Sequence, residues 1–140
     1  QRKAIERWQR SDNVYVCSAS DYNLVPFMTV SDLMVSDASS AIFEFAALDK
    51  PVVWCDFYKL RWSYRGVFKF RLKQRVDTDI DYFEQVGWKA NSAGELLAAI
   101  GRALDEPEQK RTQRRAVIEE LAGSVDGHCS RRIVEYFLGN

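Results

Sequence analysis

Polar side chains that could bind an anion interrupt an otherwise apolar stretch of the sequence, MVSDASSAIFEFAALDKPVVW at residues 34–54. The interruption includes Asp37, Ser39 and Ser40, and the carboxylate of Glu44 follows one helical turn after Ser40. Backbone N–H groups at the start of a helix attract phosphate oxygens, and adjacent hydroxyls can donate to the same anion. The spacing therefore indicates a site for a phosphorylated ligand, with Glu44 nearby as a hydrogen-bond acceptor.

The same residues also have a purely structural explanation. Serine is a favoured cap at the start of a helix, and aspartate at a strand end commonly ties a turn. If Ser39 is the cap, the third helical position holds Ile42 rather than Glu or Gln, so no full capping box would occupy the N–H groups. Local physics alone leaves both explanations open.

The elements that must hold these side chains follow from hydrophobic patterns. Runs rich in β-branched and aromatic residues predict strands at residues 13–17, 32–37, 52–56, 67–70 and 86–89. Helices are predicted at residues 4–10, after a cap at Asp21, at 39–49, at 93–104 after a cap at Ser92, at 108–122 and from Ser130 onward. The alternation of strand and helix predicts an α/β fold with a parallel sheet. Ligands of such sheets bind beyond the carboxyl ends of the strands, where Asp37–Ser40 stands.

The composition predicts a single globular domain over residues 1–140. Apolar residues make up 46% of the chain, and 20 Lys and Arg balance 20 Asp and Glu, so no net charge attracts nucleic acid. Three spaced cysteines and one histidine predict neither a disulfide framework nor a metal cluster, and they suit a reducing, cytoplasmic compartment. No signal peptide or membrane span is predicted, and the opening on Gln1 inside a helical pattern is interpreted as a fragment of a longer enzyme.

Two basic stretches, RLKQR at 71–75 and KRTQRR at 110–115, could contact nucleic acid or anionic lipid headgroups. Acidic residues adjoin both of them, because DTDID follows the first and EPEQ precedes the second. A solvated helix face is therefore the favoured interpretation, with no nucleic-acid partner. A peripheral membrane contact is kept as an alternative for residues 110–115.

Three segments together resemble the CDP-glycerol glycerophosphotransferase family, whose members build teichoic-acid-type polymers. SDLMVSDASSAIFEFAALDKPVVW is similar to the family's D-x-S-S…F-(D/E)-x-x-x-L-(D/N)-K-P core. YRGVFKF at 64–70 is similar to its R-G-(F/V)-Y-F segment, and DGHCSRRIVEYF at 126–137 to its closing helix. The resemblance implies a Rossmann-like, three-layer parallel sheet that forms the C-terminal, nucleotide-binding domain of a two-domain transferase of the GT-B type.

The resemblance also implies how the core segment binds the donor, CDP-glycerol or a related CDP-alcohol. Ser39 and Ser40 would hold the pyrophosphate through their hydroxyls and N–H groups, and Asp37 would shape the turn. Glu44 would accept hydrogen bonds from the ribose hydroxyls. No cofactor is implied, and although Mg²⁺ fits this class of reaction, no carboxylate cluster in the sequence calls for it.

The resemblance also implies roles for two further residues, and it implies that the family's catalytic histidines lie outside this chain. Arg65 would add a counter-charge to the pyrophosphate, and Ser130, near the start of the last helix, would add a phosphate contact. The family's catalytic base and its second histidine lie upstream of the segments matched here. His128 stands beside the closing D-G, where the family uses no catalytic histidine. We therefore predict no catalytic residue in this chain, and inactivity without the missing N-terminal acceptor domain.

The leading prediction is an enzyme at the inner face of the cell membrane that transfers glycerol phosphate from a CDP-activated donor to an acceptor hydroxyl during cell-surface polymer synthesis. One alternative is the C-terminal domain of a nucleotide-sugar glycosyltransferase. In those enzymes a ribose-binding Glu stands seven residues before the proline of K-P-V-V, as Glu44 does here, but their partner acidic residue falls at Ser36. The other alternative is a nucleotide-binding or protein-interaction module without turnover.

Overall fold

The structure, a computed structural model, describes residues 2–18, 20–57 and 80–139. The chain divides into two compact units, Gln1–Val30 and Ser31–Asn140, and each is described by itself. Whether residues 1–140 form the single domain predicted from the sequence stays a prediction. The predicted strand at 67–70 and the basic stretch at 71–75 lie outside the described residues.

The first unit contains two short helices, α1 (Arg2–Trp8) and α2 (Val25–Val30). The strand predicted at residues 13–17 is wrong, because local hydrogen bonds fold this segment into irregular turns. The carboxylate of Asp21 accepts hydrogen bonds from Tyr15 Oη (3.0 Å) and from the backbone N–H of Ser18 (2.7 Å). Asp21 therefore ties the preceding loop instead of capping α2, and the Val25 N–H donates to Oδ1 of Asn23 at 3.1 Å.

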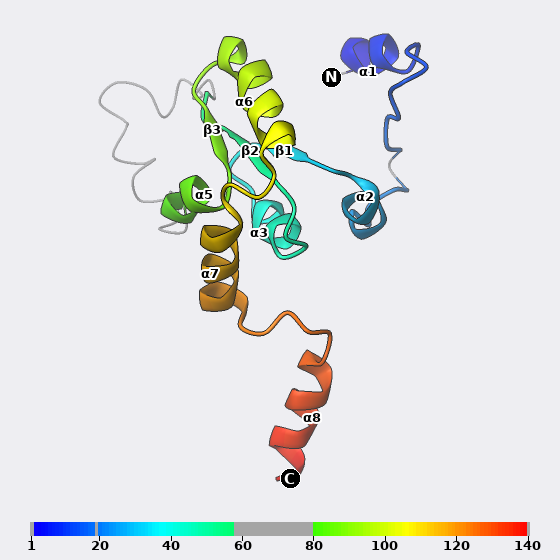
Figure 1. The fold of residues 1–140 in the computed structure, drawn as a ribbon. Helices are drawn as coiled ribbons and strands as arrows, with labels where there is room; N and C mark the ends of the chain where they lie inside the picture. The colour runs from blue at the N-terminus through cyan, green and yellow to red at the C-terminus, as the bar shows by residue number, and fades with distance from the viewer. Residues whose placement is uncertain (1, 19, 58–79, 140) are drawn as a thin grey trace, which may run out of the picture. The chain divides into compact units, whose positions relative to one another are not determined.

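The second unit is built on a parallel sheet of three strands, β1 (Met34–Ser36), β2 (Val52–Cys55) and β3 (Trp88–Ala90), in the order β1-β2-β3. Ser36 pairs with Trp54, and Trp54 pairs with Lys89, so all three strands end at the same edge. Strands joined in parallel through helices confirm the predicted α/β class and fit a Rossmann-like fold (Figure 1).

Helices cover both faces of this sheet. Helices α3 (Ala41–Ala46) and α5 (Ile80–Val86) pack on one face, together with α7 (Arg111–Ala122), and α6 (Ala93–Asp105) packs on the other. The side chains of β2 alternate between the two layers, as a strand requires. Val53 joins the buried cluster with Ala99 and Ala103 of α6, whereas Trp54 packs edge-on against Phe83 of α5, with ring centroids 5.4 Å apart.

A close backbone approach explains why β3 begins later than its predicted start at Val86. Residues 80–86 form α5, and the chain then passes through Gly87 into the sheet. A Cβ atom at Gly87 would lie only 2.7 Å from the carbonyl oxygen of Val52, so any larger residue there would push the two segments apart. Glycine is therefore required where α5 meets β2.

The start of α6 and the end of α7 agree with the sequence, whereas α1 (2–8), α3 (41–46) and the start of α7 (111) differ from the predicted bounds 4–10, 39–49 and 108. Ser92 caps α6 as predicted, since its Oγ accepts the Glu95 N–H at 3.2 Å. The carboxylate of Glu95 accepts from the backbone N–H of Asn91 at 3.1 Å, whereas in a standard capping box it would accept from the backbone N–H of Ser92. Helix α7 ends at Gly123, which has a φ of +69°.

The last element is α8 (Cys129–Leu138), which starts one residue before the predicted Ser130. None of its residues is buried, and Tyr136 and Phe137 on it are largely exposed. Across the described part of the chain, no helix combines the length and the apolar character needed to cross a bilayer.

Candidate functional site

The turn between β1 and α3 places the predicted anion-binding residues at the carboxyl edge of the sheet. Strand β1 ends at Ser36, and the Ser39 N–H donates to the carbonyl oxygen of Asp37 at 2.8 Å, which closes a tight turn. Asp37 and Ser40 are exposed, and Ser39 is half-buried. The local arrangement of strand, turn and helix is the one that the sequence predicted.

The hydroxyls of this turn are little used by the helix that follows. Ser40 occupies the cap position of α3, but its side chain makes no capping hydrogen bond. Among the described residues, the Oγ of Ser39 accepts only a long hydrogen bond, 3.4 Å, from the Ala41 N–H. The N–H groups of Ile42 and Phe43 already donate to the carbonyl oxygens of Ser39 and Ser40. A bound anion would therefore meet chiefly the serine hydroxyls, rather than the N–H groups of the first helical turn.

Glu44 lies on the exposed side of α3, one turn beyond Ser40, while Ile42 and Phe45 point into the core. Its backbone N–H reaches the carbonyl oxygen of Ser40 at 3.4 Å. The carboxylate of Glu44 therefore reaches solvent although most of its neighbours in the sequence are apolar. It stands on the same side of the helix as Ser40, since residues four apart share a face.

Asp37 lies close enough to Cys55, at the end of the neighbouring strand β2, for its charge to affect the thiol. Burial raises the pKa of the Cys55 thiol, and the negative charge of Asp37 raises it further. The thiol therefore stays protonated, which makes it a poor nucleophile. The ends of β1 and β2 form one continuous edge on which charges influence one another.

A charged cluster at the same edge was missed by the sequence reasoning. The ammonium group of Lys89 on β3 contacts the carboxylates of Asp56 (2.9 Å) and Glu84 (2.8 Å). It also lies 4.8 Å from the centre of the Trp54 ring. Hydrogen bonds to Glu84 and then to Asp56 raise the pKa of Lys89. The available signal was a lysine between two core residues, Trp88 and Ala90, in a short strand.

The predicted phosphate contact Ser130 lies in the first turn of α8, and hydrogen bonds order the segment just before that helix. Asp126 accepts hydrogen bonds from Arg132 Nη1 (2.7 and 2.8 Å) and from the His128 N–H (2.9 Å). The hydrogen bond from Arg132 is the largest cause of a lowered pKa at Asp126. Ser130 is exposed, and within the described residues no hydrogen bond joins it to the turn at Ser39.

One predicted site residue, Arg65, lies outside the described residues. In the parts of the chain that are described, no group of three or more His, Cys, Asp and Glu side chains is placed to hold a metal ion.

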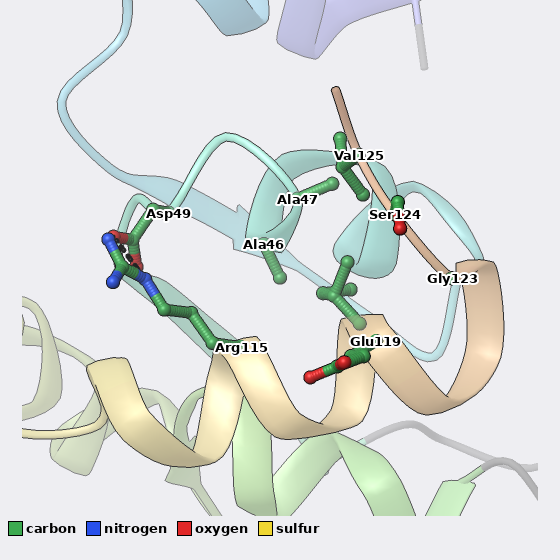
Figure 2. Close-up of a pocket in the computed structure, with 9 residues that line it drawn as sticks. Ala46, Ala47, Asp49, Arg115, Glu119, Gly123, Ser124 and Val125 are labelled. Carbon is green, nitrogen blue, oxygen red and sulfur yellow. Dashed lines mark hydrogen bonds and ion pairs between the residues drawn. The ribbon is translucent and has the colours of Figure 1, made fainter. Parts of the chain in front are cut away.

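A partly open pocket lies away from all of these residues. It has a volume of about 340 Å³ and lies between the end of α3 and α7, with Ala46, Ile118 and Val125 among its lining residues. Figure 2 shows Arg115 on α7 reaching toward Asp49, which precedes β2 at the amino edge of the sheet. The cavity is therefore on the opposite edge from the Ser39 turn.

The basic stretch 110–115 differs from the solvated helix face that was predicted. Arg111 Nε contacts Asp49 at 2.7 Å, Arg115 contacts it at 2.7 Å, and the fully buried Arg114 lies 3.4 Å from it. Burial alone would raise the pKa of Asp49, but the hydrogen bond from Arg115 and the charges of the three arginines lower it. The three arginines hold the turn at Asp49, although only Arg114 is buried and Arg115 stays exposed.

Comparison with known proteins agrees with the sequence motifs. A profile of the family described as CDP-Glycerol:Poly(glycerophosphate) glycerophosphotransferase matches residues 1–139. A stretch of 43 residues is 44% identical to the teichoic acid glycerol-phosphate primase of Bacillus spizizenii (strain ATCC 23059 / NRRL B-14472 / W23). This stretch is 31% of the present chain and 11% of the primase. No solved structure matches the chain.

Proposed function

Because this chain belongs to the CDP-glycerol:poly(glycerophosphate) glycerophosphotransferase family, we propose that it binds the CDP-glycerol donor of such a transferase. The observation that carries the proposal is the turn Asp37–Ser40 at the carboxyl edge of a parallel sheet, with two serine hydroxyls that the following helix barely uses. Ligands of open α/β sheets bind at this edge. The family supplies the identity of the ligand, and the turn supplies groups that suit its pyrophosphate.

Each residue of the turn has a distinct role in the proposal. The hydroxyls of Ser39 and Ser40 donate to the pyrophosphate oxygens, while the carbonyl oxygen of Asp37 holds the turn in shape by accepting the Ser39 N–H. Glu44, exposed one turn later, accepts hydrogen bonds from the ribose hydroxyls. Arg65 and Ser130 are proposed to add contacts to the phosphates.

The proposed reaction is a substitution at phosphorus. An acceptor hydroxyl oxygen attacks the β-phosphorus of CDP-glycerol, the bond from that phosphorus to the bridging oxygen breaks, and CMP leaves with the electron pair of that bond. The hydroxyl proton passes to a base. The groups of this chain hold the pyrophosphate and stabilise the negative charge that develops on the bridging oxygen as CMP leaves, which lowers the barrier by positioning and electrostatic stabilisation.

The base is proposed to come from outside the residues described here. We assign no catalytic residue to this chain, and we propose that it acts as the C-terminal half of a two-domain, GT-B-type enzyme whose other half carries the acceptor. We also propose that the enzyme acts at the inner face of the cell membrane, which it contacts peripherally. The primase to which it is similar is named for teichoic acid synthesis, which suits that setting.

Isothermal titration calorimetry with CDP-glycerol, CDP and UDP tests the proposal. The full-length protein should bind CDP-glycerol and CDP, and the double variant Ser39→Ala, Ser40→Ala should bind both far more weakly. Ser124→Ala serves as the control, since this exposed serine lies in the linker after α7. Unchanged binding by the double variant would refute the site. Preference for a UDP-sugar would instead support the nucleotide-sugar glycosyltransferase alternative.

A further inference from the structure

Asp56 places a second carboxylate close to the turn that is proposed to hold the pyrophosphate. Along β2, Trp54 packs toward α5, and Asp56 lies two residues further on, so its side chain points to the same face of the sheet. Lys89 confirms this placement, because its ammonium group contacts both the Asp56 carboxylate and the Trp54 ring. Helix α3, which begins after Ser40, covers the same face.

The loop that carries this carboxylate and the turn at Ser39 leave adjacent strands of the sheet. Ser36 pairs with Trp54, so the loops after β1 and β2 leave the sheet side by side. Neighbouring strands lie about 4.8 Å apart, which is less than the Debye length of about 8 Å at physiological ionic strength. The charge of Asp37 already acts across this gap on the thiol of Cys55. An uncompensated charge on Asp56 would act on a bound pyrophosphate in the same way.

We propose that Lys89 is a positioning residue for donor binding, because its ammonium group neutralises Asp56 and so removes a repulsive charge beside the pyrophosphate. This inference rests on the proposed function. Lys89 does not touch the donor in this proposal and acts only through Asp56. Glu84 holds Lys89 from the other side, at 2.8 Å, and so keeps the ammonium group over the edge of the sheet.

The local contacts distinguish this role from ordinary stabilisation. The side chains of Lys89 and Asp56 are about one-third exposed, at 30% and 31%, and Glu84 is exposed at 59%. Ion pairs this open to solvent add little to folding stability. An effect of Lys89 on donor affinity that is much larger than its effect on stability would therefore reflect its place beside the site.

The test compares the affinity of the full-length protein for CDP-glycerol across a set of variants. Lys89→Met should weaken binding about fivefold to twentyfold, as expected for a unit charge near a dianion at an effective dielectric constant close to that of water. Lys89→Arg should keep the affinity, and Asp56→Asn should match or exceed it. The double variant Lys89→Met, Asp56→Asn should recover most of the loss. Raising the salt concentration should shrink the effect of Lys89→Met.

A matched control comes from the opposite edge of the sheet. Arg102 lies in the last turn of α6, so Arg102→Met removes one positive charge at the far end of that helix. It should leave donor affinity unchanged. Melting temperatures of all variants show whether each one folds, and Lys89→Gln, which also removes the positive charge, carries the test if Lys89→Met does not fold.

Three outcomes would overturn the inference. If Asp56→Asn fails to rescue Lys89→Met, Lys89 acts directly on the donor or only on the fold. If Lys89→Met binds CDP-glycerol as well as the unaltered protein does, the charge compensation is unnecessary. If the unaltered protein binds no CDP-glycerol, the proposed function fails and this inference fails with it.

Discussion

Arg115 donates two hydrogen bonds to Oδ2 of Asp49, from Nε at 3.1 Å and from Nη2 at 2.7 Å. The same aspartate has a φ of +58°, an unusual backbone conformation for a residue other than glycine. Arg114, with no exposed surface, donates to the Asp49 carbonyl oxygen at 3.2 Å and to that of Pro107 at 3.0 Å. Asp49 is thus the point at which α7 is joined to the turn before β2.

Replacing Asp49 by alanine should destabilise the fold strongly. Arg111 and Arg115 can return to water, but the buried Arg114 would keep its charge without a counter-ion, and breaking such a pair typically costs about 3–5 kcal/mol. The partial exposure of Asp49 places the expected loss at the lower end of that range. In urea unfolding, this loss should appear as a lower urea concentration at the midpoint, while the dependence of the unfolding free energy on urea concentration stays the same. Asp105→Ala, at an exposed position at the end of α6, is the control, and equal losses in the two variants would contradict the assignment.

Acid should destabilise the chain partly through this aspartate. The pKa of Asp49 is lowered in the folded protein, so the folded state binds fewer protons than the unfolded state around and below the usual aspartate pKa of about 3.9. Its contribution is therefore present above that pH and is lost as the pH falls through the lowered folded-state pKa. Between about pH 7 and about pH 3, the free energy of unfolding should fall less for Asp49→Asn than for the unaltered protein. Parallel curves would count against this contribution.

Two glycines should respond to alanine in opposite directions. Gly87→Ala would press a Cβ to 2.7 Å from the Val52 carbonyl oxygen, and overpacking of this kind costs about 1–3 kcal/mol. Gly101→Ala, inside α6, meets no atom within 4 Å and should stabilise the protein by about 0.5–1 kcal/mol. Melting temperatures of the two variants, measured side by side, are the test. A stable Gly87→Ala variant would show that the approach of α5 to β2 is looser than described.

Two serines at helix starts should separate stability from binding. The Oγ of Ser92 accepts the Glu95 N–H, so Ser92→Ala should lose about 1 kcal/mol of stability and leave CDP-glycerol affinity intact. Ser40 makes no capping hydrogen bond, so Ser40→Ala should leave the melting temperature nearly unchanged while weakening donor binding. Calorimetry and thermal melts on both variants decide the matter. A large stability loss at Ser40 would restore the purely structural explanation of that residue.

Much of the sheet could be predicted because its signals are local. VVWC is a continuous apolar run of the kind that parallel, doubly covered strands use, and it forms β2 as expected. Ser92 and Gly123 marked the helix ends correctly. The run NVYVC has a similar composition but forms no strand, and the carboxylate of Asp21 instead accepts from the Tyr15 hydroxyl and from the N–H of Ser18.

The charged clusters could not be predicted because they depend on contacts between distant segments. Arg111, Arg114 and Arg115 are spaced to lie on one face of α7, which the sequence alone presents as a solvated face. Only the fold brings that face against Asp49, more than sixty residues earlier in the chain. The contacts of Lys89 with Asp56 and Glu84 likewise require β2, β3 and α5 to meet. The turn at Ser39 needed no such information, because its strand and helix are adjacent in sequence.

The ion pairs between the arginines of α7 and Asp49 also bear on how the protein moves. Arginine keeps its proton at any pH that a cell reaches, and an aspartate with a lowered pKa keeps its negative charge. At cellular pH these ion pairs therefore stay charged, and α7 should move with the sheet as one rigid unit. Amide protons of α7 and β2 should exchange with solvent together and slowly, and any motion that accompanies turnover must be accommodated by other segments.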